Sequence, residues 1–210
     1  MDRSPDLPRT DPPSADPAAL GERLRTLRTR SGMSLRALAR ALDISPSAVS
    51  QIERGQLQPS VNRIIAIANA LDVPLALVFE TAEQHDDRVS TDSELGHDYV
   101  LARQGQVPPV HLEGGVIFRS LSPVSTPRVQ LFESTYPPGS RGSVHGDLIR
   151  HVGFEVGRVT QGELTIEFAT ERVVLGVGDS ITFPCTVPHL LLNDSATTTV
   201  ATWLIADPER

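Results

Sequence analysis

The sequence has no lysine and only one cysteine, Cys185, and aromatic residues are few. A single cysteine excludes an internal disulfide, which is typical of a protein from a reducing compartment. No apolar run is long enough to span a bilayer, and the N-terminus lacks the apolar core of a signal peptide. These absences predict a cytoplasmic protein with no membrane partner. The 210 residues suffice for one large domain or two small ones.

Charges of opposite sign dominate different parts of the chain. The net charge is −7, yet residues 20–80 carry eight arginines against five acidic residues. Residues 81–210 carry nine arginines against 17 acidic residues. A basic part joined to an acidic remainder is expected when only the first part contacts phosphates.

Two stretches have the composition of connecting segments. Residues 1–17 carry five prolines among polar side chains, and we expect a disordered tail there. Residues 81–98 are polar, acidic and aperiodic, which is typical of a linker. The folded parts are therefore expected at 18–80 and 99–210.

Residues 18–80 have the apolar periodicity of five short helices. The first helix carries Leu20, Leu24 and Leu27 on one face, and Gly32 is expected to end it. The next three helices are expected to bury Leu35, Leu38, Ala39, Leu42, Val49, Ile52, Val61, Ile64, Ile65, Ala68 and Leu71. This pattern predicts a compact all-α module.

The ends of these helices are also marked. Ser34 and Ser45 are typical N-caps, and Pro46 suits the first position of the third helix, where a missing N–H has no cost. Gly55 is expected to end that helix, and Pro74 to open the fifth. The outer side of the third helix is left with short polar residues.

Three runs in this module carry a specific pattern. They are Ser-x-x-x-Leu-Ala at 34–39, Ile-Ser-x-Ser at 44–47 and Ser-Gln-Ile-Glu-Arg-Gly at 50–55, and Pro59-Ser60 follows them. With them, residues 20–80 resemble the lambda-repressor-like (Xre family) helix-turn-helix. The resemblance implies that the third helix lies in the major groove of DNA, with its N-terminal residues at base edges.

The resemblance also implies which residues contact DNA. They are Ser34, Ser45, Pro46, Ser47, Ser50, Gln51 and Arg54. Ser34 and Arg54 fall at phosphate-contacting positions and the others at or beside base edges, where a glutamine can pair with adenine. Position 35 is often glutamine in the family but is Leu35 here, so a phosphate contact there stays open. Glu53 cannot favour DNA, and we expect it to pair with Arg28.

From about residue 99 the sequence changes to short β-rich runs. They lie at 116–121, 128–136, 154–160, 163–169, 180–184 and 197–206, separated by turn signals. Many short strands at regular spacing predict an antiparallel sandwich or barrel.

Two motifs fall among these strands, His151-x3-Glu155-x6-Gly162 and Gly178-Asp179-x4-Pro184-x4-His189-x3-Asn193. They resemble the two motifs of the cupin superfamily, a small jelly-roll barrel. The fold class that follows is α + β, with a five-helix module and an all-β cupin domain. The resemblance implies that His151, Glu155 and His189 point into the mouth of the barrel. There they would hold a divalent metal such as Fe, Zn, Mn or Ni.

The spacing agrees with such a site. His151 and Glu155 are an even number of residues apart, so on one strand both would face the same side. His189 is expected from an adjacent strand. Two imidazoles and one carboxylate suit Fe(II) and related metals. Cys185 is expected to be a small buried side chain.

The motifs also contain departures. Ile149 and Thr186 stand where a histidine and a glycine are usual in the motifs, and His145 is nearby with a spacing that does not fit. The polar groups would otherwise line a pocket without metal, and that alternative stays open. Four arginines in this domain are candidates to contact an anionic effector, none of them favoured: Arg119, Arg128, Arg150 and Arg158.

The two resemblances together imply a transcriptional regulator whose cupin domain senses a small molecule or a metal. One helix-turn-helix contacts one half-site, so a homodimer on a palindromic operator is expected, with the barrel as the dimerisation surface. The alternative is an enzyme, because the layout also resembles the iron-dependent epoxidase of fosfomycin biosynthesis. There the helical domain covers a substrate. The full DNA-reading pattern favours the regulator.

Overall fold

The structure is a computed structural model that describes residues 17–79, 101–103, 105–122, 128–143 and 146–206. The expected linker at 81–98 and nearly all of the expected tail lie outside these residues. Five helices make up the first part: α1 Pro17–Arg30, α2 Leu35–Ala41, α3 Pro46–Glu53, α4 Val61–Ala70 and α5 Leu75–Phe79. The prediction of five helices is confirmed, although Pro17, which we assigned to the tail, opens α1.

The expected helix caps are present. The hydroxyl oxygens of Ser34 and Ser45 accept hydrogen bonds from the backbone N–H groups of Ala37 and Ala48, each at 3.1 Å. Ser60 caps α4 in the same way. Gly55 has a φ of 67°, in the left-handed region that ends a helix at low cost.

The expected ion pair between α1 and α3 is also confirmed. Arg28 donates from Nε to Oε1 of Glu53 at 2.5 Å and from Nη2 to Oε2 at 2.9 Å. Both side chains are buried, and the hydrogen bond to Glu53 raises the pKa of Arg28. At Gly21 a Cβ atom would lie 2.5 Å from the carbonyl oxygen of Ile52, so only glycine allows α1 to lie this close to α3. The sequence analysis did not predict this close contact between α1 and α3.

The second part consists of two antiparallel sheets. The larger has the order β1 Val110–His111, β2 Ile117–Ser120, β3 Val129–Tyr136, β9 Thr199–Ala206, β4 Phe154–Gln161 and β7 Ser180–Pro184. The smaller has the order β6 Arg172–Leu175, β5 Leu164–Phe168 and β8 His189–Leu192. All six predicted strands are present. The prediction missed β1, β6 and β8, which have two to four residues and are too short for a period-2 pattern.

The two sheets enclose a packed interior. Trp203 of β9 is 1 % exposed and donates from Nε1 to the hydroxyl of Ser134 at 3.0 Å. Its ring lies over Gly157 of β4, where a Cβ atom would overlap it. Trp203 is therefore part of the barrel core.

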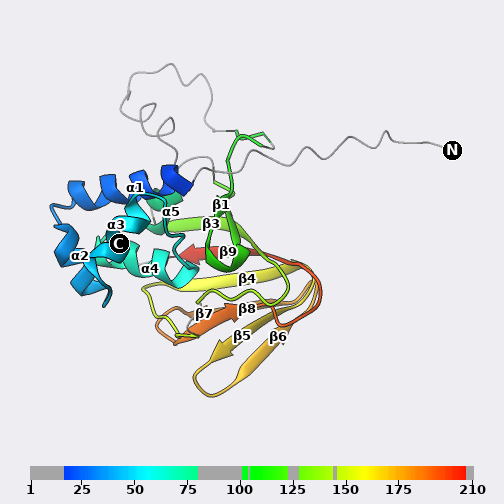
Figure 1. The fold of residues 1–210 in the computed structure, drawn as a ribbon. Coiled ribbons are helices and arrows are strands. Elements are labelled where there is room, and N and C mark those ends of the chain that lie inside the picture. The colour runs from blue at the N-terminus through cyan, green and yellow to red at the C-terminus, as the bar shows by residue number, and fades with distance from the viewer. Residues whose placement is uncertain (1–16, 80–100, 104, 123–127, 144–145, 207–210) are drawn as a thin grey trace.

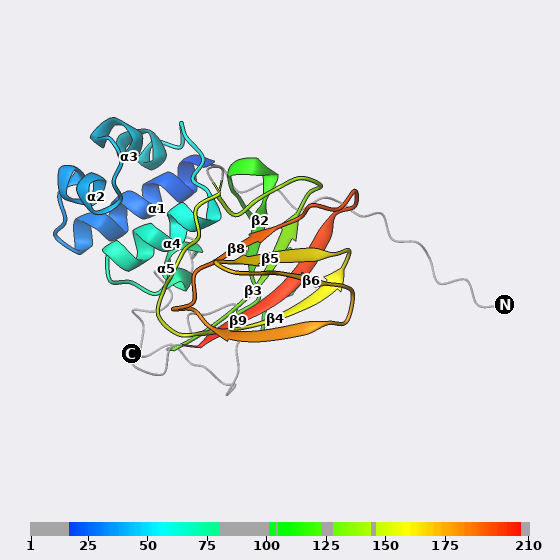
Figure 2. The ribbon, with the colours of Figure 1, turned by 90° about the horizontal axis from the view of Figure 1, so that it is seen from below.

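The helices are packed against one end of the barrel, with α4 on the side of the module that faces the strands (Figures 1 and 2). The buried apolar side chains of both parts form one cluster. Phe79 of α5 stacks on Phe118 of β2, with ring centroids 5.8 Å apart. The helical module thus shares a core with the barrel. No described helix is both long and apolar enough to cross a membrane.

Backbone and side-chain hydrogen bonds fix the start of α4 on the barrel. Asn62 donates from its backbone N–H to the carbonyl of Gly142 at 3.0 Å and from Nδ2 to the carbonyl of Asp147 at 2.7 Å. The backbone N–H of Glu113 donates to the carbonyl of Pro59 at 3.1 Å. The two bonds from Asn62 join the helical module to the segment that leads into His151.

Candidate metal centre between the barrel and helix α4

The three residues of the two cupin-like motifs meet inside the barrel mouth. One ligand atom each from His151, Glu155 and His189 can be chosen so that all lie within 4.8 Å of one another. Nε2 of His151 is 3.1 Å from Oε1 of Glu155, and Nε2 of His189 is 3.8 Å from Oε2. The three side chains are at most 6 % exposed. The sequence therefore identified a real cluster.

The route by which His151 reaches this cluster differs from our prediction. Only Glu155 is on β4, because the strand begins at Phe154. The His151 N–H donates to the carbonyl of Cys185 at 3.0 Å, and the Cys185 N–H donates to the carbonyl of Gly153 at 2.8 Å. Gly153, with a φ of 106°, bends the chain between them. This bend, rather than strand alternation, brings His151 to the side of Glu155.

His189 also comes from a different direction than expected. It begins β8 in the smaller sheet, whereas β4 belongs to the larger one. The two sheets face each other across the barrel, so the site is built from both. The backbone of His189 pairs with Ile149 at 2.9 and 3.1 Å, which connects β8 to the segment before His151.

Hydrogen bonds at the back of each imidazole orient its ligating nitrogen. Nδ1 of His189 is 2.8 Å from the carbonyl of Val187, and Nδ1 of His151 is 3.2 Å from the carbonyl of Val152. A carbonyl can only accept, so each Nδ1 carries a proton, and each Nε2 is turned towards Glu155. Burial lowers the pKa of His189, which keeps its imidazole neutral. A hydrogen bond from the non-ligating ring nitrogen to a backbone carbonyl is usual for histidines that bind a metal.

The cluster has buried acceptor atoms for which the described residues supply no hydrogen-bond donor. Oε2 of Glu155 and Nε2 of His189 are both buried and have no hydrogen-bond partner within the described part of the chain. A divalent cation among the three side chains would satisfy both atoms, because it accepts lone pairs from carboxylate and imidazole. Two imidazoles and one carboxylate also leave positions open for a further ligand.

The departures from the motifs do not remove this donor set. The side chain of Ile149 lines the cavity next to Glu155 and His189. Cys185 is fully buried, as expected for a small core residue. His145 lies outside the described residues.

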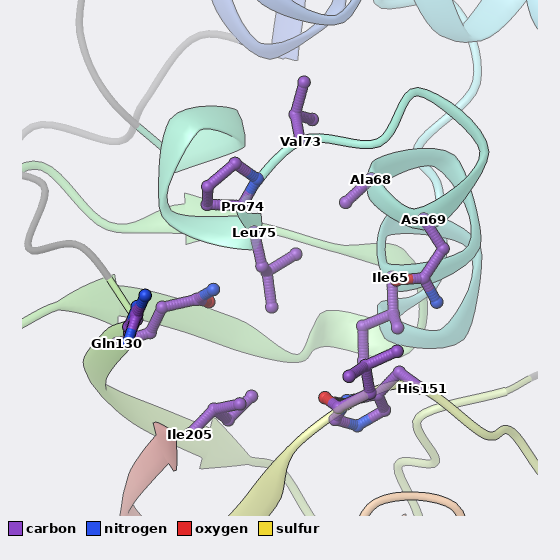
Figure 3. A pocket seen from close by; sticks show the side chains of 11 residues that line it. Ile65, Ala68, Asn69, Val73, Pro74, Leu75, Gln130, His151 and Ile205 are labelled. Carbon is purple, nitrogen blue, oxygen red and sulfur yellow. Dashed lines mark hydrogen bonds between the residues drawn. The ribbon is translucent and has the colours of Figure 1, made fainter. Parts of the chain in front are cut away.

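Two cavities adjoin the cluster. The inner one, about 20 Å³, is lined by Glu155, His189, Tyr136 and Asn62 together with mostly apolar residues. The outer one, about 90 Å³, lies beside His151 between the barrel and helices α4 and α5 (Figure 3). Ile65 of α4 lines both cavities, and Figure 3 shows its side chain directed towards His151. Sequence periodicity identified Ile65 only as a core residue.

The expected DNA-contacting residues lie on an open face of the helical module. The exposed ones are Ser34, Ser45, Pro46, Ser47, Gln51 and Arg54, whereas Ser50 is half-buried. The hydroxyl oxygens of Ser34 and Ser45 already accept cap hydrogen bonds, so each is left with its O–H to donate.

Comparison with known proteins gives two family matches. Residues 19–80 match the helix-turn-helix domain family, and residues 132–205 match the cupin domain family. The chain is also similar to the HTH-type transcriptional regulator PuuR of Escherichia coli (strain K12). The two are 27 % identical over 179 residues, which cover 85 % of this chain and 89 % of PuuR. The chain combines a helix-turn-helix domain with a cupin domain, and these matches indicate a transcriptional regulator.

One solved structure agrees with this fold over nearly its whole length. The crystal structure of an HTH_3 family transcriptional regulator from Vibrio cholerae aligns with 92 % of this chain and with 98 % of its own length. The TM-score is 0.64 at 20 % identity. The structure of hydroxypropylphosphonic acid epoxidase from S. wedmorenis aligns with 91 % of this chain and with 100 % of its own length. The identity is 18 % and the TM-score is 0.43. The family matches and PuuR indicate a regulator rather than an enzyme.

Metal analysis tests the cluster directly. We expect the purified wild-type protein, loaded with Co(II) or Fe(II) and desalted, to retain about one metal ion per chain. Replacing His151 and Glu155 by alanine should abolish this retention, because only one ligand remains. The matched control is His111→Ala in β1, which should retain the metal. Equal retention by the double variant would rule out the assigned ligands.

Proposed function

We propose that this regulator binds a divalent metal at His151, Glu155 and His189, with a small-molecule effector beside it, and that this occupancy changes its affinity for DNA. One observation carries the proposal: α4 of the DNA-binding module forms a wall of both cavities next to the cluster. An occupant of the barrel mouth would therefore contact the DNA-binding module directly.

The structure offers a short path from this wall to the third helix. The loop after α3 leads through Pro59 and Ser60 into α4. Its start is held by hydrogen bonds from the N–H groups of Gln56 and Leu57 to the carbonyl of Gln51, on α3. A ligand can regulate only if it binds one arrangement of these elements better than another. An occupant that presses on Ile65 would meet that condition.

The outer cavity favours an anionic effector. Its polar lining includes the side chains of Arg128, Gln130 and Asn69, and none of the described residues that line it is acidic. Arg128 is the one of the four candidate arginines that lines this cavity. The small volume and the cationic lining fit a compact carboxylate that reaches towards the metal beside His151.

The function is tested by measuring operator affinity with and without metal. An operator fragment selected from random sequence serves as the probe, and succinate and the uncharged succinamide are added to the metal-loaded protein. We expect Co(II) to change the dissociation constant by about tenfold, within the usual range of coupling energies. Succinate should shift it further and succinamide should not. The variant lacking His151 and Glu155 should not respond, and an unresponsive wild type would refute metal sensing.

We further propose that the module reads DNA as its family does. Base edges would be contacted from Ser45, Pro46, Ser47 and Gln51, with Ser50 beside them. Phosphates would be contacted from Ser34 and Arg54.

Replacing Gln51 by alanine should reduce operator affinity by about 1–3 kcal/mol and leave nonspecific affinity nearly unchanged, since a bidentate contact to adenine would be lost. Gel-shift titrations on operator and random duplexes measure both. Gln56→Ala, which removes an exposed glutamine beyond the end of α3, is the control. A loss of the same size on both duplexes would contradict base reading.

The regulator is proposed to act as a homodimer on a two-fold symmetric operator, held together through the barrel. The outer face of the larger sheet exposes apolar rows. Leu131, Leu204 and Val156 lie side by side across β3, β9 and β4, with Val129 and Phe154 in the next row. Val156 is 42 % exposed and Phe154 47 %. Contiguous apolar surface of this kind marks interaction sites.

Replacing Val156 by aspartate should therefore shift the protein to a monomer in analytical ultracentrifugation and weaken operator binding by tenfold or more. Val174→Asp on β6, where the side chain is 55 % exposed on the smaller sheet, is the matched control and should leave the dimer intact. A Val156→Asp variant that stays dimeric would exclude this face.

A further inference from the structure

Tyr136 is a fourth polar group at the candidate metal centre. We propose that its hydroxyl donates a hydrogen bond to an oxygen ligand on the open position of the metal. Tyr136 would thereby select oxygen-donor ligands, such as water or a carboxylate. The inference rests on the metal centre proposed above and adds a residue that neither cupin-like motif contains.

The hydroxyl of Tyr136 is buried without a partner. The residue ends β3, faces the barrel interior and has no exposed surface. Its Oη atom has no hydrogen-bond partner among the described residues, and it lines the inner cavity with Glu155 and His189. Burying an unsatisfied hydroxyl destabilises a fold, so such groups are uncommon unless a bound molecule satisfies them.

A neighbouring hydroxyl shows the contrast. Ser134, two residues earlier on the same face of β3, is also fully buried. It accepts a hydrogen bond from Trp203 and donates to the carbonyl of Ala201. The hydroxyl of Ser134 thus has hydrogen-bond partners within the barrel. The hydroxyl of Tyr136, a residue that shares a cavity with the cluster, has none among the described residues.

The groups around the inner cavity complement one another. Oε2 of Glu155 and Nε2 of His189 present lone pairs, which suit a cation. The hydroxyl of Tyr136 stays protonated, because burial and the nearby carboxylate of Glu155 raise its pKa. It therefore contributes the proton donor that an oxygen bound to the metal requires. A cavity of about 20 Å³ has room for roughly one water-sized group.

The backbone of Tyr136 is fixed by a residue of the second motif. Asn193, fully buried, donates from Nδ2 to the carbonyl of Tyr136 at 2.8 Å and to that of Thr197 at 2.7 Å. The N–H of Gly139 donates to the carbonyl of Asn193 at 2.8 Å. The start of the turn after β3, and with it the backbone of Tyr136, is thereby held.

The test uses the full chain loaded with Co(II), whose visible absorption bands report its ligands. Formate is the probe for an oxygen ligand. In the wild type, formate should change the Co(II) spectrum with saturation. In Tyr136→Phe, Co(II) affinity should be unchanged, while formate affinity falls about tenfold, the loss expected for one hydrogen bond to a charged ligand. Thr160→Val, which removes an exposed hydroxyl from β4, is the control and should behave as wild type.

The outcomes separate this inference from the function on which it rests. A wild type that binds no Co(II) refutes the metal centre. Co(II) binding with equal formate affinity in both proteins, or with no formate response, refutes the role of Tyr136 alone. The melting temperature of the metal-free Tyr136→Phe protein should equal or exceed that of the wild type, since an unsatisfied group is removed. A clear fall would mean that the hydroxyl is structural, and would overturn the proposal.

Discussion

The two hydrogen bonds from Asn62 to the carbonyls of Gly142 and Asp147 hold the first turn of α4 against the segment that leads to His151. Together with the shared apolar core, these hydrogen bonds join the helical module and the barrel into a single folded unit. Helix α4 then has two roles, since it supports the helix-turn-helix and closes the barrel mouth. A change in the barrel mouth cannot leave α4 unaffected, because interiors are closely packed. This contact would be the physical basis for the proposed coupling of a ligand to DNA binding.

The electrostatics of the barrel mouth follow from the same enclosure. Away from water, the carboxylate of Glu155 faces the Nε2 atoms of two imidazoles, whose Nδ1–H groups donate to backbone carbonyls instead. Such a cluster is costly when empty and favourable with a cation in place. Metal binding would therefore stabilise the junction of the two modules as well as fill the site.

A helical module over the mouth of a cupin barrel could act either as a lid for a substrate or as a link to DNA. The exposed polar face of α3 distinguishes these roles, because a lid has no need of Ser47 and Gln51 on a surface turned to solvent. The family matches and the similarity to PuuR agree with a helical module that contacts DNA rather than one that covers a substrate.

The sequence by itself determined what depends on local pattern. Helix periodicity, the caps at Ser34 and Ser45, the Arg28–Glu53 pair and six strands were all readable, because each is encoded within a few residues or within a family motif. The identity of the cluster was readable too, but its construction was not. Glycine at 153 bends His151 into place, and His189 arrives from the facing sheet. The roles of Tyr136, Ile65 and Asn62 depend on which segments the fold brings together across many residues. Only the tertiary structure decides those contacts, because they are set by packing rather than by local sequence.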